Sequence, residues 1–332
     1  MEMTNSKFKI HNSKLLTYLL ITLSVVFWGV SFILTKELFL TEEHITVTIL
    51  ISIRLAIASL VMLPALALTG RLQPIRKGPG KGLRALWRGD LKWFLLLAFC
   101  EPFIYHICET SGVQIVSGSL ASVIIATIPL FVPFGMWFAY RQRIRTPLIV
   151  GVVLSLAGVG IMLLGGEGLS GNLRGLLFLA GAVAIAVVYT LLLVKVVAKY
   201  SPLVVTTWQN LIGLLYFLPL MFVFDGDQLP LLSWSPRMLL LLGALGVFCS
   251  TLAYAGYNHA VRHLGASEAC IFNNAIPVFS LIAAILIGQE SFSWGKLAGV
   301  VIVISGVVIA QWQPRQSSGS QESPGPSAWD RG

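Results

Sequence analysis

Three side chains that carry a charge at neutral pH, Arg54, Glu101 and Glu109, lie inside stretches of sequence that are otherwise almost entirely apolar. A charged group in hydrocarbon is costly, so such residues are kept mainly where they pair with one another or meet a solute. Glu101, Tyr105 and Glu109 are four residues apart, which places them on one face of a helix. At about 1.5 Å per residue, Arg54 lies ~12 Å and Glu101 ~15 Å from the outer ends of their segments, at nearly equal depth. These residue types predict a buried Arg–carboxylate pair beside a site for a charged or zwitterionic solute.

The Arg54–Glu101 pair leaves two interpretations open. It can be a structural pair that steadies the second and third helices, or it can face a central cavity where one member meets the substrate. Glu109 lies nearer the outer end of the same helix as Glu101. It therefore belongs either to the entrance of such a cavity or to a solvated helix end.

Two residues near these carboxylates add to the chemistry. His106 is titratable near neutral pH, and it serves either proton coupling, together with a carboxylate, or packing and hydrogen bonding. Pro102 directly follows Glu101, and its ring should clash with the carbonyl group of Ala98 and bend the helix. A bend beside a charged residue suits a helix that moves or lines a cavity.

The second half of the chain carries neutral hydrogen-bonding groups instead of charges. Asn210 and Asn273 each lie ~10 Å from the inner ends of their segments. A ring of such groups at one depth suits a pathway for polar solutes, but hydrogen bonding from helix to helix would use the same residue types. The aromatic residues either close the cavity or only pack. The candidates in this group are Trp208, Gln209, Asn210, Tyr254, Asn258, Asn273 and Asn274, together with Trp28 and Tyr189.

The composition identifies the elements that must position these side chains. Hydrophobic residues make up 56% of the chain and charged residues 11%, against about 25% charged residues in soluble domains. Apolar stretches of roughly 20 residues recur along the chain, and each is long enough to cross a hydrocarbon layer of ~30 Å. The sequence therefore predicts an all-α integral membrane protein with ten transmembrane helices, at about 15–35, 46–68, 91–111, 116–139, 146–165, 173–194, 203–224, 238–258, 266–288 and 295–313.

An internal repeat divides this set of helices into two. The segment Ile128–Phe131 returns as Ile276–Phe279, 148 positions later (277 − 129). Two halves with five crossings each would be inserted in opposite directions, as in many transporters whose site lies between the copies. The sequence thus predicts two inverted five-helix repeats, 15–165 and 173–313. The segment 1–14 would be cytoplasmic, and the polar tail 314–332 is expected to be disordered.

Glycines repeat at the same distance. Gly151 and Gly158 in the fifth predicted helix return as Gly299 and Gly306 in the tenth. Glycines seven residues apart share one helix face and permit close approach of a second backbone. These faces can pack against each other within one chain, or they can form the seam of a homodimer.

The distribution of Lys and Arg predicts the orientation. With a cytoplasmic N-terminus, most of the 23 basic residues fall on the inner side, and the outer side holds only Lys36, Arg174, Arg237 and Lys296. This asymmetry predicts that both termini are cytoplasmic and that the chain spans the cell's inner membrane several times. The net charge of +9 then reflects this bias and attraction to the lipid bilayer, with no nucleic acid as partner. The four cysteines are spaced neither as a disulfide framework nor as a metal cluster.

The chain resembles the drug/metabolite transporter superfamily, and within it the EamA-type members with ten helices. The resemblance covers about residues 15–313, and one departure lies at Tyr140–Gln142, where the first half lacks the Gly-x-Glu turn of the second. It implies a carrier that works by alternating access and often exports amino acids or related metabolites. The residues that carry it are Phe27–Phe32, Gly265–Ser267, Ile276–Phe279, Gly288–Glu290 and the glycines of the tenth helix.

These observations together favour a secondary transporter of a small polar solute. The sequence carries no phosphate-cradling glycine loop, no His-Glu-x-x-His motif and no Gly-x-Ser-x-Gly elbow. Transport is therefore expected to run on solute or ion gradients, without a cofactor or a metal. A membrane enzyme acting on lipid-linked substrates and a scaffold that transports nothing are the alternatives. The first would need its acidic groups at a membrane surface, and the second has no need of charges near the midplane.

Overall fold

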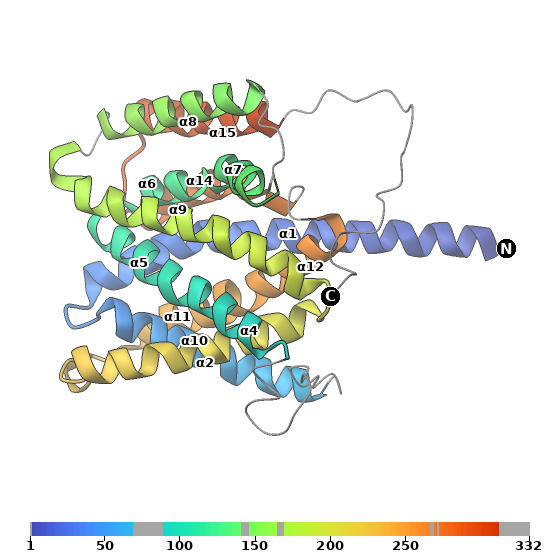
Figure 1. The fold of residues 1–332 in the computed structure, drawn as a ribbon. Coiled ribbons are helices and arrows are strands. Elements are labelled where there is room, and N and C mark those ends of the chain that lie inside the picture. The colour runs from blue at the N-terminus through green and yellow to red at the C-terminus, as the bar shows by residue number, and fades with distance from the viewer. Residues whose placement is uncertain are drawn as a thin grey trace.

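The computed structural model describes residues 2–68, 89–140, 146–164, 169–265, 269–270 and 272–311, and every regular element in these ranges is helical (Figure 1). Most of the basic loop after residue 70, Arg141 and Gln142, Ala266 and Ser267, and the tail 314–332 lie outside the described residues. In chain order the elements are α1 (Glu2–Thr41), α2 (Val47–Leu68), α4 (Leu91–Ala98), η1 (Phe99–Ile104), α5 (Tyr105–Ile115), α6 (Gly118–Ile125), α7 (Ile128–Tyr140), α8 (Thr146–Leu164), α9 (Leu169–Val197), α10 (Pro202–Phe224), η2 (Leu229–Leu231), α11 (Pro236–Ala244), η3 (Leu245–Leu252), α12 (Ala253–Leu264), η4 (Asn273–Ala275), α14 (Ile276–Ile287) and α15 (Trp294–Gln311).

The helices confirm the predicted fold class. Within the described residues, seven helical segments are long and apolar enough to cross a membrane, and three shorter apolar helices accompany them. These ten follow the order of the predicted stretches. Several boundaries differ from the prediction. Helix α1 includes residues of the predicted N-terminal segment and continues to Thr41, and α12 continues to Leu264. The fourth stretch divides into α6 and α7 at a turn through Ala126 and Thr127.

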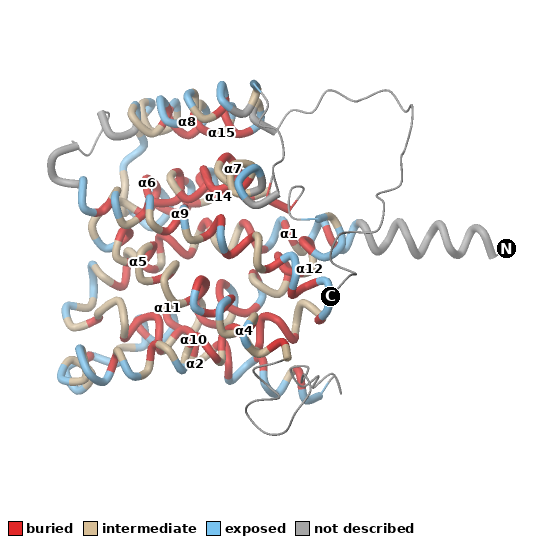
Figure 2. The backbone as a smooth tube through the Cα atoms, viewed as in Figure 1, coloured by how far each residue is buried: buried red, intermediate tan, exposed pale blue. Residues whose placement is uncertain are grey.

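Helices from the two halves of the chain are interleaved. Helix α1 packs against α12 and α14 of the second half, and α9 packs against α5 and α7 of the first. Helix α2 pairs with α10, and α8 pairs with α15 along one edge of the bundle (Figure 1). Buried positions lie mainly between the helices, and many exposed ones lie on the outside of the bundle (Figure 2). The interior of the bundle is therefore built from both halves.

The third and eighth transmembrane segments are both interrupted near their middle. The π-helical turn η1 separates α4 from α5, and the π-helical turn η3 separates α11 from α12. At Glu101 the backbone is extended, with φ −141° and ψ 115°. The residue before a proline is pushed out of the α region by the proline ring, so the bend predicted at Pro102 is confirmed. No proline lies in η3, and the interruption of the eighth helix was not predicted.

The turn after α14 connects the two halves at one end of the bundle. Gly288 ends α14 with φ 82°, a conformation that glycine adopts without steric cost. The carboxylate of Glu290 then accepts hydrogen bonds from the backbone N–H and the hydroxyl group of Ser119, at 3.3 and 2.8 Å, and pairs with Lys296. A carboxylate in this place is also favoured by the dipole of α6. The Gly288–Glu290 motif thus fixes the start of a first-half helix.

The glycine faces of α8 and α15 pack against each other within one chain. A Cβ atom on Gly306 would lie 2.7 Å from the carbonyl oxygen of Gly151, and one on Gly158 would lie 2.9 Å from that of Gly299. The first interpretation of these faces is therefore confirmed.

Replacing Gly306 with alanine is expected to lower stability by about 1–3 kcal/mol, because the new methyl group meets backbone atoms that cannot move aside. The matched control is Gly160→Ala in α8, where an added Cβ meets nothing within 4 Å and the helix should gain slightly. The measurement is the apparent melting temperature in detergent, followed by tryptophan fluorescence. Equal melting temperatures for the two variants would show that the helices do not make this contact.

Candidate functional site

A cavity lies inside the bundle, with walls from both halves of the chain. Its volume is about 80 Å³. The elements that line it include α1, α2, η1, α5, α9 and α12. The structure brings nine of the sequence-selected residues together here: Trp28, Arg54, Glu101, Tyr105, His106, Glu109, Tyr189, Tyr254 and Asn273.

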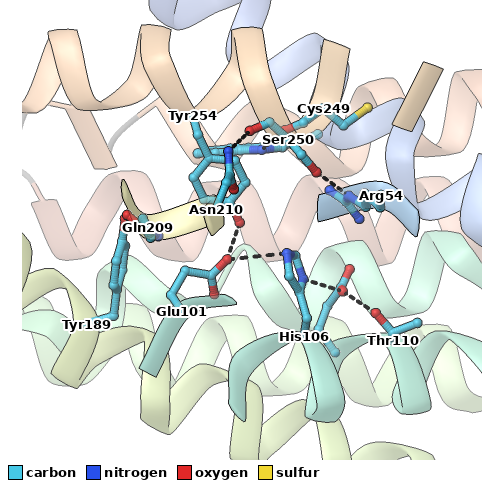
Figure 3. A network of polar contacts seen from close by, with 12 residues as sticks. Arg54, Glu101, His106, Thr110, Tyr189, Gln209, Asn210, Cys249, Ser250 and Tyr254 are labelled. Carbon is cyan, nitrogen blue, oxygen red and sulfur yellow. Dashed lines mark hydrogen bonds and ion pairs between the residues drawn. The ribbon is translucent and has the colours of Figure 1, made fainter. Parts of the chain in front are cut away.

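His106 lies between the carboxylates of Glu101 and Glu109, and Figure 3 shows it beside Glu101. Its Nε2 atom is 3.5 Å from Oε1 of Glu101, and its Nδ1 atom is 3.5 Å from Oε2 of Glu109. All three side chains are buried. The hydroxyl group of Thr110 donates to Glu109 at 3.0 Å. Glu109 therefore belongs to the wall of the cavity, and the alternative of a solvated helix end is wrong.

Aromatic rings form the wall next to Glu101. The hydroxyl group of Tyr254 donates a hydrogen bond to Oε1 of Glu101. The ring of Trp28 packs against Tyr254 and Tyr257, with centroids 5.0 Å apart in both pairs. Aromatic faces beside a carboxylate are suited to hold a cationic group. The break at Pro102 matters here, because the extended backbone of Glu101 determines where this carboxylate lies.

Arg54 lines the same cavity but does not form the predicted pair with Glu101. Its Nε atom donates to the hydroxyl oxygen of Ser250, and among the described residues no carboxylate oxygen comes within 4.0 Å of its guanidinium. Glu101 turns instead toward Tyr254 and His106. The charges thus share one cavity without contact. The Nη groups of Arg54 make no hydrogen bond within the described part of the chain, which leaves them available to a ligand.

The interruption η3 supplies the acceptors that hold this wall in place. The carbonyl oxygen of Ser250 accepts from Nδ2 of Asn210 at 3.2 Å, and that of Cys249 accepts from Nε1 of Trp28 at 3.2 Å. A π-helical turn disturbs the usual helical hydrogen bonds, so its carbonyl groups can accept from side chains. The same turn places the Ser250 hydroxyl group against Arg54.

Five of the predicted candidates do not line the cavity. Three of them make hydrogen bonds between helices, as the alternative interpretation expected. Gln209 and the hydroxyl group of Tyr189 exchange hydrogen bonds at 3.3 and 3.4 Å. Asn258 donates to Thr206 at 2.9 Å, and Asn210 bonds to η3 as described above. The five are Trp208, Gln209, Asn210, Asn258 and Asn274.

Several lining residues were not selected from the sequence. Ser31 and Tyr257 are polar, and each lies three residues after a selected aromatic residue, Trp28 or Tyr254, on the same helix face. That spacing was the signal that could have found them. The others are mostly apolar, and nothing in their type separates them from core residues: Phe32, Ile125, Ile128, Ala186, Thr190 and Ile276.

The cysteines and the acidic residues show no arrangement for a metal. Within the described ranges, no group of three or more His, Cys, Asp or Glu residues could hold a metal ion. The four cysteines are free. Two of them contact polar groups nearby, since the thiol of Cys249 donates to the carbonyl oxygen of Phe27 at 3.3 Å and Cys270 lies 3.2 Å from the hydroxyl group of Tyr257.

Comparison with known proteins matches each half of the chain to the same family. The EamA-like transporter family matches this chain twice, over residues 15–164 and 173–311. An uncharacterized transporter of Archaeoglobus fulgidus is 25% identical over 292 residues, which cover 88% of this chain and 97% of that protein. The uncharacterized transporter YetK of Bacillus subtilis is 28% identical over 285 residues, which cover 83% and 82% of the two chains.

A solved structure supports the fold. It aligns with a TM-score of 0.65 at 19% sequence identity and covers 91% of this chain and 99% of its own. At this identity the likeness concerns the fold alone. The two matches of the family, the ten helices and the shared cavity agree with one another. The chain is a multi-pass membrane protein, and it belongs to the EamA-like transporter family.

Proposed function

We propose that this protein is a secondary transporter that moves a small polar metabolite, an amino acid or a related solute, across the inner membrane by alternating access, with export as its working direction. The observation that carries the proposal is the cavity between the halves. It holds a guanidinium whose Nη groups are free of described partners, and it holds two buried carboxylates beside aromatic rings. In a chain from a family of transporters, such a cavity suits transient binding of a charged solute.

The proposed architecture is a pair of five-helix repeats inserted in opposite directions, with both termini cytoplasmic. Contacts between elements support it, because they recur when the halves are exchanged. Helix α1 packs on α12 and α14, as α9 packs on their counterparts α5 and α7, and α2 and α8 pair with their own counterparts α10 and α15. The interruptions η1 and η3 also fall in corresponding segments. Broken helices at corresponding places are a recurring feature of transporter sites.

The cavity offers complementary groups to the two ends of an amino acid. The planar guanidinium of Arg54 suits a carboxylate. Glu101 and the aromatic rings, which line the same cavity, suit an ammonium group. Asn273 adds a buried Oδ1 atom that accepts no hydrogen bond in the described structure. A solute with a donor group would satisfy this acceptor, which otherwise costs free energy.

The test is transport by the purified protein in liposomes. Vesicles loaded with unlabelled solute would be diluted into labelled solute, and counterflow would be measured for amino acids, amines and organic acids. Saturable counterflow of at least one class is the expected result, with protein-free liposomes as the control. If no solute in the panel shows saturable flux, the protein is not a carrier of these solutes, and the proposal is wrong.

The position of the acidic groups separates this proposal from the enzyme alternative. Glu101 is 3% exposed and Glu109 is 5% exposed, and both line the internal cavity. An enzyme acting on lipid-linked substrates would need such groups where a lipid headgroup can reach them. The buried position therefore favours a solute that enters the cavity whole.

A further inference from the structure

The side chains of Glu101, His106 and Glu109 form a row in which a titratable ring lies between two acids. One ring nitrogen of His106 faces each carboxylate, at 3.5 Å in both cases. A neutral imidazole carries one N–H group and one lone pair, so it can donate to one carboxylate only. The lone pair then faces the oxygen atoms of the other acid. A second proton on the ring removes this conflict, because both nitrogens become donors. The arrangement thus has room for one additional proton, shared among three residues.

Other groups around these three residues limit where the proton can go. Tyr254 from α12 donates to Glu101, and Thr110 donates to Glu109. The Nδ1 atom of His106 is buried and makes no hydrogen bond in the described structure. The acceptor that faces it is the carboxylate of Glu109, at 3.5 Å. The remaining titratable or charged groups that line the cavity are Arg54 on α2, Tyr105 on α5, Tyr189 on α9 and Tyr257 on α12.

Either a proton on His106 or a bound cation makes the net charge of the site zero. With His106 protonated and both acids ionised, the positive charges of Arg54 and His106 balance the charges of Glu101 and Glu109. Loss of the proton leaves the buried site with one net negative charge, and a buried charge without compensation is costly. A bound ammonium group restores the balance. The aromatic rings of Trp28 and Tyr254 line the same cavity and are suited to hold such a group.

We propose that Glu101, His106 and Glu109 form a proton-binding site, and that this proton is exchanged for a solute that carries one net positive charge on an ammonium group. The proposal rests on the proposed function, because it names the substrate class and the coupling ion of the same cavity. On binding of the solute, the proton leaves His106 to water in the cavity and then to the side on which the cavity is open. One proton returns when the solute has left on the other side. The exchange is electroneutral.

The test uses liposomes that contain the full chain, with labelled L-lysine, L-arginine and ethanolamine as cationic probes. Liposomes whose interior is one pH unit more acidic than the outside should accumulate a transported probe about tenfold in their interior. One pH unit is a tenfold ratio of proton activity, and each entering solute is exchanged for one proton that leaves. A membrane potential set with potassium and valinomycin should drive none, because the exchange moves no net charge. Anionic probes such as succinate should not respond to the pH gradient.

Variants locate the proton. His106→Gln removes the titratable ring and should lower the accumulation driven by the pH gradient from about tenfold to about onefold, while any remaining counterflow becomes independent of pH. The matched control is His259→Gln in α12, a histidine that contacts Thr17 and does not line the cavity. It should keep the tenfold accumulation.

The outcomes distinguish this inference from the function on which it rests. Counterflow of a cationic probe without any response of the wild-type protein to the pH gradient would overturn the inference and leave the transporter proposal intact. Accumulation driven by the membrane potential alone would also overturn it, as would a His106→Gln variant that keeps full accumulation. Absence of counterflow for every solute in the wider panel would reject the transporter proposal and this inference together. The measurements on the wild-type protein decide the matter even if the variant fails to fold.

Discussion

Replacing Arg54 with glutamine is expected to lower the transport rate about 100-fold at limiting solute concentration. Arg54 is 2% exposed and lines the cavity, and its Nη groups have no hydrogen-bond partner among the described residues. Removing the arginine from its proposed buried contact with the carboxylate of the solute costs roughly 2–5 kcal/mol, and about 2.7 kcal/mol corresponds to a factor of 100. The loss should appear with zwitterionic and cationic solutes alike, because the charge of Arg54 also balances one of the two acids.

The measurement is the initial rate of counterflow per mass of monodisperse protein. Arg54→Lys is expected to give an intermediate rate, because an ammonium keeps the charge but loses the planar fork of the guanidinium. The control variant is Arg237→Gln, which removes a mostly exposed arginine that pairs with Glu37 away from the cavity. Its rate should stay within about twofold of wild type, because Arg237 does not line the cavity and Glu37 keeps the hydrogen bond from Gln289. A similar loss in both arginine variants would mean that Arg54 has only a structural role.

Much of the fold could be predicted because the length of an apolar stretch is a property of the sequence alone. The ten stretches and the bend at Pro102 are examples, since a proline restricts its own backbone and that of Glu101 whatever surrounds them. The interruption η3 has no such local cause in Leu245–Leu252. It depends on partners from other helices, such as Arg54 and Asn210, which hydrogen-bond to it.

The candidate site could be predicted in part. Equal depth correctly brought Arg54 and Glu101 into one cavity, but depth does not specify which atoms meet. The predicted contact between Arg54 and Glu101 was wrong, because the carboxylate of Glu101 contacts His106 and Tyr254 instead. The amides were harder to assign. A helix that is apolar on every side carries little pattern to show which face points inward, so Gln209 gave no sign that it would bond to a neighbouring helix.

A charge within a membrane segment was a more reliable guide to the cavity than depth alone. Charged residues such as Glu109 lie in the cavity because lipid excludes them from the outer surface of the bundle. Neutral amides can satisfy their hydrogen bonds against another helix at low cost, as Asn258 does with Thr206. A charge within a membrane segment therefore indicates the cavity more strongly than an amide at the same depth.

Glu101→Gln is expected to reduce transport by a factor of ten or more while the yield of folded protein changes by less than about twofold. Glutamine has the size of glutamate, and its carbonyl oxygen can still accept the hydrogen bond from Tyr254, so the packing of the cavity wall should survive. The negative charge that faces His106 is lost, and with it one of the two acids that would attract an ammonium group. Loss of one charge-assisted contact costs about 1.5–3 kcal/mol, which corresponds to roughly 10- to 150-fold in rate.

Folded yield and counterflow must be measured on the same preparations, by size-exclusion chromatography and by initial rates. The matched control is Glu42→Gln, because Glu42 accepts hydrogen bonds from Ser233 and Ser235 and does not line the cavity. It should leave both quantities close to wild type. If Glu101→Gln lowers yield and transport by the same factor, then the carboxylate stabilises the broken third helix and does not bind solute. A specific loss of transport would instead place Glu101 in the solute pathway, since the carboxylate and the amide differ here mainly in charge.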